Sequence, residues 1–242
     1  MNKYIISILF SLSTFAVAQN ALSDQEKKEG WQLLFDGKSL EHWRNFKKET
    51  ISPKWIVKEG AMVKTKGGGD IVTKKKYQNF DLKLDWKIAI AGNSGIFILA
   101  NETVADKKIY TRAPEIQILD NEKHSDRKSA SHRSGSLYDM IAAPDSSQKP
   151  AGEWNTLRVL FDNRHLQVWQ NGVVAFDVKL GSEAWKKALN GSKFKNWPGF
   201  ADAFSGHIGV QEHGADVSLR NIKIKPLPAT AAAESAPVIE LK

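Results

Sequence analysis

The segment from Phe80 to Ile88 alternates between apolar and charged residues with a period of two. Its apolar side chains would share one face of an extended chain, and its Asp and Lys side chains would share the other. A helix would spread the same residues around its circumference, so the pattern predicts a β-strand with one buried face. Segments with similar alternation predict further strands at 56–58, 61–63, 71–73, 95–100, 115–119, 136–138, 157–161, 165–170, 173–178, 207–211 and 217–225.

The connections between these segments indicate how the strands pair. Asn171-Gly172 separates two of them, and this dipeptide readily adopts the positive φ angles of a tight hairpin. Gly, Asn, Pro and Asp residues lie between the other predicted strands, and only residues 23–29 and 182–189 have a helical pattern. We therefore predict an all-β fold, a two-sheet antiparallel sandwich with one domain.

The first residues of the chain differ from the rest. Lys3 gives a basic start, residues 5–10 form an apolar run, and residues 16–18 provide a small-residue cleavage motif. This arrangement is typical of a secretory signal peptide, so we expect export to the periplasm or the extracellular space. No segment approaches the roughly 20 apolar residues that a membrane-spanning helix needs. We expect a signal peptide, an N-terminal lead-in, a main domain and a flexible C-terminal tail at 1–18, 19–29, 30–226 and 227–242.

The composition excludes several kinds of chemistry. The chain has no cysteine, so disulfides and thiolate metal sites are excluded, and stability comes from core burial. Its formal charge is +8, with lysine runs such as 74–76. No nucleic-acid recognition motif accompanies this charge, so we interpret the runs as solvated faces and expect no nucleic-acid partner. The oligomeric state stays open.

Polar residues also lie where a strand face is usually filled otherwise. Glu115 and Gln117 share one face of the predicted strand 115–119, opposite two isoleucines. Gln211 and His213 repeat the arrangement near the end of another predicted strand. Such residues either face solvent or form the floor of a site. The polar stretches are 67–70, 93–95, 115–120 and 206–214.

Seven blocks of sequence, in order along the chain, carry a resemblance to a known family: GWQLLFDGKSLEHW from Gly30, GDIVTKKKYQNFDLKLDWKI from Gly69, NSGIF from Asn93, PEIQILDN from Pro114, SGSLYD from Ser134, AGEWN from Ala151 and GHIGVQEHGADVSLRNIKIK from Gly206. They resemble the 3-keto-disaccharide hydrolase family, which was formerly a domain of unknown function. The resemblance implies a concanavalin-like jelly roll of the lectin and glucanase type, with a concave sheet that binds a small carbohydrate. It also implies action on glycosides whose C3 hydroxyl has been oxidised to a ketone, by hydrolases or by eliminases.

Two positions depart from the family pattern. Glu212 stands where the family often has Asp, which lengthens the acid by one methylene group. Ser218 and Leu219 stand where many members have an aromatic pair. The first departure leaves the position of the acid open. The second leaves open whether this region stacks on a sugar or packs locally.

Cleavage of a 3-keto-glycoside sets three chemical requirements. The ketone acidifies the C2 hydrogen, and the glycosidic oxygen at C1 is β to the resulting carbanion. A base near C2, a hydrogen-bond donor or positive charge near the C3 oxygen, and an acid near the leaving oxygen are therefore needed. His213 is our candidate base because imidazole titrates near neutral pH. Glu115 is a candidate base, acid or metal ligand, Asp120 a further catalytic candidate, and Tyr138 a candidate oxyanion donor.

Seven further residues are candidates for substrate binding. The glutamines would hold sugar hydroxyls through paired donor and acceptor groups. Trp197 lies in a predicted loop, where its indole offers a stacking surface for a sugar. For Asp120 a turn role is the alternative. The predicted substrate-binding residues are Asn93, Ser94, Asp70, Arg112, Gln117, Gln211 and Trp197.

A divalent metal ion is a further possibility for the positive charge. His132, His207, His213, Glu115 and Asp120 are suitable ligand types, but no His-x-His or Glu-x-x-His spacing occurs, so the metal stays open. Two other functions compete with 3-keto-glycoside cleavage. One is a non-catalytic glycan-binding module, and the other is a glycosidase that uses two carboxylates on unoxidised glycosides.

Overall fold

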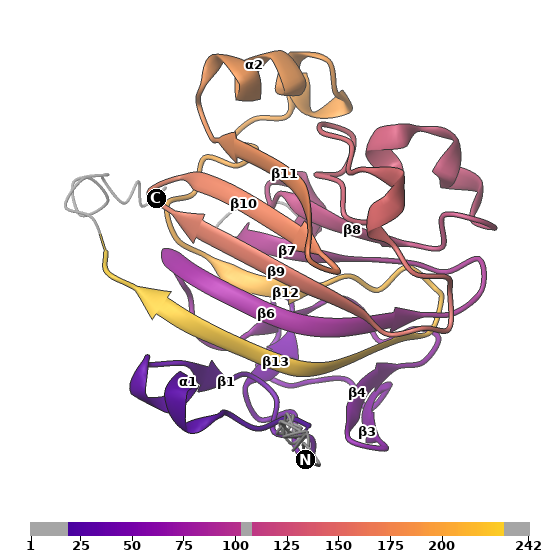
Figure 1. Ribbon diagram of the computed structural model, residues 1–242, viewed down its shortest axis with the longest axis vertical. Coiled ribbons are helices and arrows are strands. Elements are labelled where there is room, and N and C mark those ends of the chain that lie inside the picture. The colour runs from indigo at the N-terminus through magenta and orange to yellow at the C-terminus, as the bar shows by residue number, and fades with distance from the viewer. Residues whose placement is uncertain (1–18, 103–107, 230–242) are drawn as a thin grey trace, which may run out of the picture.

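The computed structural model describes residues 19–102 and 108–229, and these form two antiparallel β-sheets packed face to face (Figure 1). The predicted signal peptide and most of the predicted tail lie outside the described residues. The two-sheet antiparallel jelly-roll prediction is confirmed. The eight-stranded sheet contains, in spatial order, β11 (Val173–Lys179), β10 (His165–Gln170), β9 (Asn155–Asp162), β6 (Asn79–Ile88), β13 (Val217–Leu227), β4 (Ala61–Lys64) and β3 (Trp55–Lys58), with β1 (Gln32–Leu33) paired to β13. The five-stranded sheet contains β2 (Trp43–Asn45), β5 (Ile71–Thr73), β12 (His207–Val210), β7 (Asn93–Ala100) and β8 (Glu115–Leu119).

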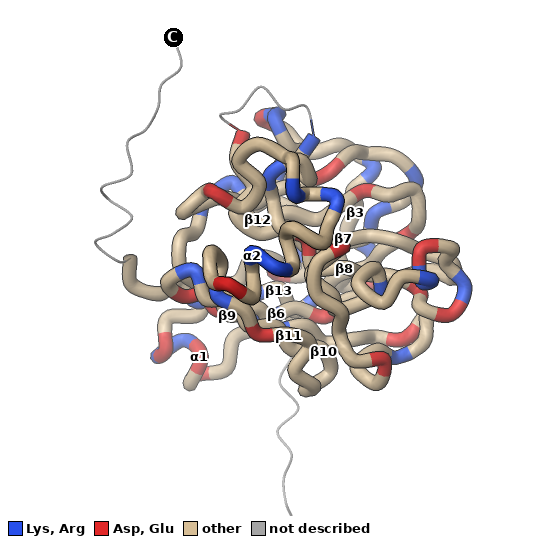
Figure 2. The backbone as a smooth tube through the Cα atoms, turned by 90° about the horizontal axis from the view of Figure 1, so that it is seen from above, with Lys and Arg blue, Asp and Glu red and all other residues tan. Residues whose placement is uncertain are grey.

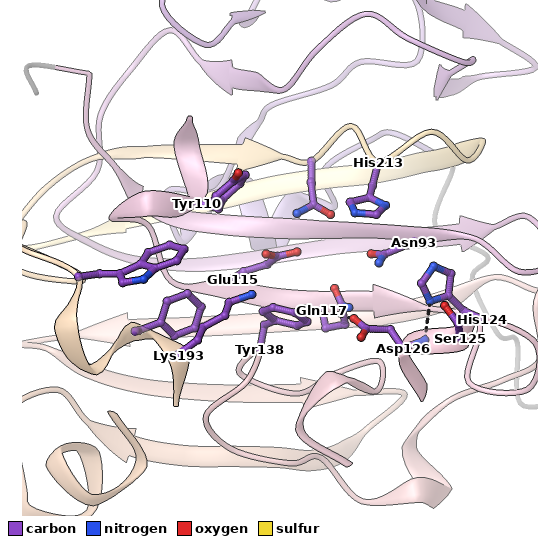
Figure 3. Close-up of a pocket in the computed structure, with 13 residues that line it drawn as sticks. Asn93, Tyr110, Glu115, Gln117, His124, Ser125, Asp126, Tyr138, Lys193 and His213 are labelled. Carbon is purple, nitrogen blue, oxygen red and sulfur yellow. Dashed lines mark hydrogen bonds between the residues drawn. The ribbon is translucent and has the colours of Figure 1, made fainter. Parts of the chain in front are cut away.

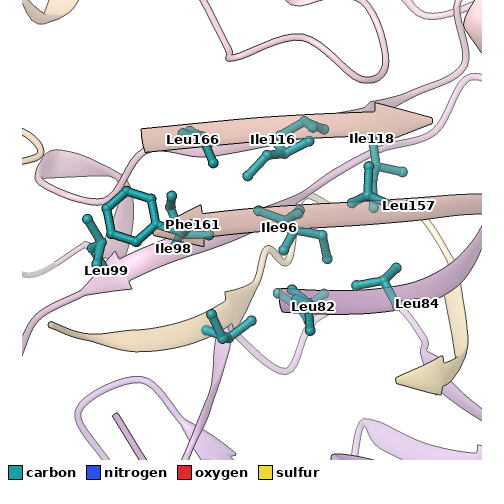
Figure 4. Packing of buried hydrophobic residues seen from close by; sticks show 14 of the residues in the cluster. Leu82, Leu84, Ile96, Ile98, Leu99, Ile116, Ile118, Leu157, Phe161 and Leu166 are labelled. Atoms are coloured by element: carbon teal, nitrogen blue, oxygen red, sulfur yellow. The ribbon is translucent and has the colours of Figure 1, made fainter. Parts of the chain in front are cut away.

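The core fills the space between the sheets, as the alternation predicts. On β6, Leu82 and Trp86 are fully buried, whereas Lys83 and Lys87 are partly exposed on the opposite face. Burying an aliphatic or aromatic side chain of this size contributes about 1.5–3 kcal/mol each. Figure 4 shows side chains from β6, β9 and β10 packed against side chains from β7 and β8: Leu82, Leu84, Leu157, Phe161, Leu166, Ile96, Ile98, Leu99, Ile116 and Ile118.

Two short helices connect or precede strands where the sequence predicts them. In α1 (Asp24–Lys28) the Ser23 hydroxyl accepts the N–H of Glu26, whose carboxylate accepts the N–H of Ser23. This reciprocal capping box satisfies N–H groups that a helix start leaves free. At α2 (Glu183–Asn190) the preceding Ser182 hydroxyl accepts the N–H of Trp185, a single N-cap hydrogen bond. Five 3-10 segments complete the described helices: η1 (Ile109–Thr111), η2 (Ser125–Lys128), η3 (Ala130–His132), η4 (Asp145–Ser147) and η5 (Lys193–Asn196).

The strand predicted at 136–138 is wrong. Only Leu137 forms bridges there, to Ile116 and Ile141, and the chain reverses immediately because the N–H of Ile141 donates to the carbonyl of Leu137. Alternation over three residues cannot distinguish a strand from such a turn. For the same reason the short strands β1 and β2 were not predicted.

The outward face of the five-stranded sheet differs from an ordinary solvated face. Inward residues of β7 and β8 such as Ile96 and Ile116 join the main core. Outward residues include Phe97, which packs with Val72 and Ile109 in a second apolar cluster. Residues of η1, η2 and η5 also line a pocket on this face, and this pocket is the candidate site.

Candidate active site

A pocket of about 530 Å³ opens on the outward face of the five-stranded sheet (Figure 3). Strands β7 and β8, the chain after β12, the turn at Tyr138, and the segments η1, η2 and η5 with their flanking residues contribute its lining. Seven of the eleven predicted catalytic or substrate-binding residues line it, so these distant segments do converge as the resemblance implies. The lining residues are Asn93, Tyr110, Glu115, Gln117, His124, Ser125, Asp126, Tyr138, Lys193, Phe194, Trp197, Gln211 and His213.

Glu115 is an unusually buried carboxyl group. It keeps 7% of its surface exposed, and it fits because Gly95 on the neighbouring strand has no side chain. A Cβ at Gly95 would lie 2.1 Å from Glu115 Oε1. Burial raises the pKa of Glu115 to about 8; the positive charge of Lys193 opposes the shift, and the carboxylates of Asp70 and Asp126 reinforce it. Glu115 is therefore mostly protonated at neutral pH.

Three amide side chains line the pocket with polar atoms that lack partners. The described residues contain five buried side-chain nitrogen or oxygen atoms without a hydrogen bond, and four of them belong to Asn93, Gln117 and Gln211. Leaving such an atom unpaired costs about 1–3 kcal/mol. Because all three amides face the same pocket, a ligand with several hydroxyl groups would supply the missing partners.

A chain of hydrogen bonds supports one side of the pocket. The Tyr138 hydroxyl donates to Asp126 Oδ2 at 3.1 Å, and His132 bridges Asp126 Oδ1 at 2.9 Å and Asp139 Oδ1 at 2.7 Å. Burial alone would raise the pKa of Asp126. The hydrogen bond and the positive charge of His132 outweigh this effect, so the pKa of Asp126 lies below its usual value. Burial, together with Asp126, raises the pKa of Tyr138. Tyr138 thus stays neutral, with its proton directed to Asp126 rather than free for an oxyanion.

His213 lies at the rim, directly after the segment that carries Gln211. It is exposed, and its ring lies 6.5 Å from the ring of His124 in an edge-to-face arrangement. His124 is fixed because its Nδ1 accepts the N–H of Asp126, the dashed line in Figure 3. His213 and Glu115 therefore line the same pocket, which is the arrangement that a base and an acid acting on one substrate require.

Asp120 lies outside the lining of this pocket. Its Oδ2 accepts the N–H of Ala91 at 2.7 Å, and its Oδ1 accepts the N–H groups of Glu122 and Lys123. The carboxylate thus closes a turn and ties it to the loop before β7, which is the turn role considered as the alternative.

Ser94 and Arg112 also lie outside the lining. The Ser94 hydroxyl donates to the carbonyl of Gln211 at 2.8 Å, so it positions a residue of the pocket. Arg112 lies against Gly199, where an added Cβ would meet its Nη1 at 1.8 Å, and its carbonyl accepts the N–H of Ala201. Both residues therefore contact segments that build the pocket, but their side chains are not part of its lining.

The candidate metal ligands do not gather at one point. His207 Nδ1 lies 2.6 Å from the carbonyl oxygen of Thr73, and its Nε2 lies near Arg44 and Glu102, which form an ion pair. His132 is held between Asp126 and Asp139 and does not itself line the pocket. Within residues 19–102 and 108–229, no group of three or more His, Asp or Glu side chains is arranged to hold a metal ion.

Comparison with known proteins decides the family. A family model described as the 3-keto-alpha-glucoside-1,2-lyase-like domain matches residues 30–225. The chain belongs to this family. A protein from Bacteroides thetaiotaomicron named 3-keto-disaccharide hydrolase is 34% identical, over 92% of this chain and 87% of its own length.

Solved structures carry the same similarity. A crystal structure of a candidate glycosyl hydrolase from Parabacteroides distasonis superposes with a TM-score of 0.82 at 33% identity, and covers 87% of this chain and 100% of its own. A second one from that organism has a TM-score of 0.66 at 29% identity, and covers 81% and 99%.

The structure shows the surroundings of Glu212 and Leu219, which depart from the pattern of the 3-keto-alpha-glucoside-1,2-lyase-like family. Glu212 accepts a hydrogen bond from the fully buried ammonium of Lys64 at 3.0 Å and from the N–H of Gly214 at 2.7 Å, while its own N–H donates to Asp70. Asp70 therefore helps to anchor the turn that carries the rim histidine, although it does not line the pocket. Leu219 is fully buried in the core, so it packs rather than contacting a sugar.

Six lining residues were not predicted from the sequence. They lie on 3-10 segments or at their ends, where no periodicity marks which side chains face inward. Lys193 gave the weakest signal, since lysines are abundant and usually solvated. For Lys193 and Phe194 on η5, the available signal was a polar residue followed by aromatic residues in a loop. The six are Tyr110, His124, Ser125, Asp126, Lys193 and Phe194.

Within the described part of the chain no helix is both long and apolar enough to cross a membrane.

Proposed function

We propose that this protein cleaves 3-keto-glycosides, either 3-keto-disaccharides or 3-keto-glucosides, by removing the C2 proton and expelling the group at C1. The observation that carries the proposal is Glu115, a carboxyl group of raised pKa in a pocket with unpaired amides and a rim histidine. The family match and the hydrolase names of the relatives support an enzyme that acts on carbohydrates.

The first step is removal of the C2 proton. His213 takes this proton through an imidazole nitrogen, and the C–H electron pair moves into an enolate whose negative charge lies on the C3 oxygen. Lys193 lines the same pocket, and its ammonium stabilises that charge. Since the Tyr138 hydroxyl donates to Asp126, the lysine replaces tyrosine in the oxyanion role.

The second step is loss of the leaving group. The enolate electrons form the C1–C2 double bond, the C1–O bond breaks, and the glycosidic oxygen takes the proton of Glu115. The products are the free leaving group and an unsaturated 3-keto sugar. Addition of water across the new double bond gives net hydrolysis, so lyase and hydrolase outcomes differ only in this later step.

Product analysis tests the proposal. The purified protein should release the leaving group from a 3-keto-glucoside and leave the parent glucoside intact. In heavy water, NMR of a hydrated product should show deuterium at C2, and an unsaturated product identifies the lyase outcome. Hydrolysis without C2 exchange contradicts the proposed step. Saturable binding without turnover, unchanged in His213→Ala and Glu115→Ala, supports a non-catalytic glycan-binding module instead.

One observation favours a second candidate, a glycosidase of unoxidised glycosides. A protonated Glu115 and an ionised Asp126 share the pocket, which is the pairing of acid and carboxylate that such enzymes use. Against it, both Asp126 oxygens already accept hydrogen bonds from Tyr138 and His132. Turnover of the parent glucoside decides between the two.

We also propose that the protein is exported. The proposal rests on the sequence alone, because the predicted signal peptide lies outside the described residues. Sequencing the N-terminus of the secreted or periplasmic protein tests it: a chain that begins near Gln19 supports cleavage after Ala18.

A further inference from the structure

The pocket has two chemically different ends. Asn93, Gln117 and Gln211 supply unpaired amide groups on the side of the sheet strands. Phe194 and Trp197 belong to η5 and its C-terminal end, and their rings form one group with Tyr110. Figure 3 shows Tyr110 on the opposite side of Glu115 from Gln117, so this aromatic group forms the other end of the pocket. A sugar with several hydroxyl groups fits the amide end, because each hydroxyl needs a hydrogen-bond partner.

The aromatic end is rigidly built. The Phe194 ring stacks on Phe200 with a centroid distance of 4.1 Å and meets the Trp197 indole edge-to-face at 5.0 Å. Trp197 in turn lies 6.1 Å from the Tyr110 ring, tilted by 41°. Tyr110 comes from η1, so two separate segments build this aromatic wall, which consists of Tyr110, Phe194 and Trp197. The side chains of Tyr110 and Trp197 are partly exposed. Rings fixed in this way lose little freedom when a ligand stacks on them.

Glu115 lies between the two ends. Figure 3 shows its carboxyl group flanked by Tyr110 on one side and by Gln117 on the other. In the proposed reaction the acid must reach the glycosidic oxygen, which joins the 3-keto sugar to the leaving group. With the sugar at the amide end, the leaving group therefore extends over the aromatic wall.

We infer that Tyr110, Phe194 and Trp197 form a leaving-group subsite that selects 3-keto-glycosides whose leaving group presents a flat apolar face. The inference rests on the proposed function and adds a substrate class to it. Both an aryl aglycone and the apolar face of a second pyranose ring have this chemistry. A small saturated leaving group such as methanol does not.

Three substrates with the same 3-keto sugar test the subsite: a nitrophenyl, a methyl and a disaccharide 3-keto-glucoside. Trp197→Ala should lower kcat/KM for the nitrophenyl substrate about tenfold more than for the methyl substrate. Comparing variant with wild type on each substrate cancels the different intrinsic leaving abilities. Tyr110→Ala, on the other segment, should produce the same selective loss, whereas Trp169→Ala, a tryptophan of β10 outside this pocket, should produce none.

The outcomes separate the subsite from the reaction. A selective loss for the disaccharide as well as the aryl substrate shows that sugar rings use the wall, and a loss for the aryl substrate alone restricts it to aglycones. Equal losses on all three substrates in folded variants overturn the subsite while leaving the proposed function standing. Absence of turnover by the wild type on every substrate overturns the proposed function, and the subsite with it.

Discussion

The outward faces of the two sheets look alike in sequence and differ in how their polar groups are paired. On the eight-stranded sheet, Asp81 receives two hydrogen bonds from Arg158 at 2.9 and 2.7 Å, and Asp85 pairs with Arg220 at 3.2 Å. On the five-stranded sheet, both polar atoms of the Gln117 amide lack a partner. Alternation therefore identifies an outward face, and only the pairing of its side chains distinguishes a solvated surface from a binding site.

The net charge of the chain says less about where a binding site lies than the pairing of its polar side chains does. Figure 2 shows Lys and Arg positions interspersed with Asp and Glu positions along the backbone. The formal charge of +8 is thus not concentrated in one stretch of the described chain. The groups that matter for the proposed reaction are few and lie in one pocket, whereas the paired charges of the large sheet stabilise its outer face modestly.

The largest expected effect comes from replacing the buried acid. Glu115→Gln keeps the volume of a carboxyl group that is already neutral at pH 7, but it cannot release a proton to the leaving oxygen. We expect kcat on a 3-keto-glucoside to fall about 1,000-fold, within the range for loss of general acid catalysis. Steady-state kinetics and thermal unfolding of the same preparation provide the measurement, and the unfolding temperature at pH 7 should not fall, because glutamine gains no charge when the chain unfolds.

Glu122→Gln is the matched control, because Glu122 is exposed and outside the pocket. It should retain wild-type kcat. If Glu115→Gln kept more than about a tenth of the wild-type rate, Glu115 would not act as the acid, since removing a general acid usually costs at least 100-fold.

The second prediction fills the space that Glu115 occupies. In Gly95→Ala the new Cβ would lie 2.1 Å from Glu115 Oε1, so the carboxyl group must move. We expect kcat/KM to fall about 100-fold, the scale associated with a displacement of about 1 Å in an active site. Gly191→Ala should be nearly neutral, because its Cβ meets only backbone oxygens at 3.5 Å or more. Unchanged kinetics in Gly95→Ala would show that the position of Glu115 does not matter.

Most of the fold was predictable because its strands are long enough to show a period. β6 and β13 bury one face each, so their sequence reports their geometry directly. The short strands β1 and β2 show no period, and the segment 136–138 alternates although it is a turn. A local sequence pattern does not predict a strand whose pairing depends on residues far away in the sequence.

The residues of the pocket were easiest to predict on strands and in the blocks that resemble the family. Glu115 and Gln117 were identified because polar residues alternate with buried isoleucines there. Asp126 and Lys193 reach the pocket from 3-10 segments, where a residue's direction depends on tertiary packing. Asp120 illustrates the opposite difficulty, because a carboxylate near a strand end serves equally well as a turn acceptor, and here it accepts the N–H groups of Ala91 and Glu122.

The third prediction concerns pH. With Glu115 as the acid, kcat/KM should fall by about tenfold per pH unit above pH 8, because the ionised group has no proton to give. Between about pH 4.5 and 8 the folded protein holds a proton that the unfolded chain has released. The free energy of unfolding should therefore fall as pH rises through this window, by at most about 5 kcal/mol from this group.

Denaturant titrations and pH–rate profiles of wild type and Glu115→Gln measure both effects. The variant should lose the alkaline limb of the rate profile, and its free energy of unfolding should decline less over the same window. A wild-type rate that instead rises through pH 8, with this rise lost in Glu115→Gln, would assign Glu115 the role of base.

The smallest effect belongs to the outer face of the large sheet. Asp81→Asn removes a carboxylate that Arg158 binds through two hydrogen bonds, and the Arg158 side chain is itself 43% exposed. Solvent screens such a pair, so we expect unfolding to become easier by about 1 kcal/mol or less. Turnover should stay within twofold of the wild type, since Asp81 does not line the pocket. Asp85→Asn is the parallel test on the same strand. A large loss of activity in either variant, with unfolding unchanged, would mean that paired charges on this face also serve the reaction, and the contrast between the two faces would no longer hold.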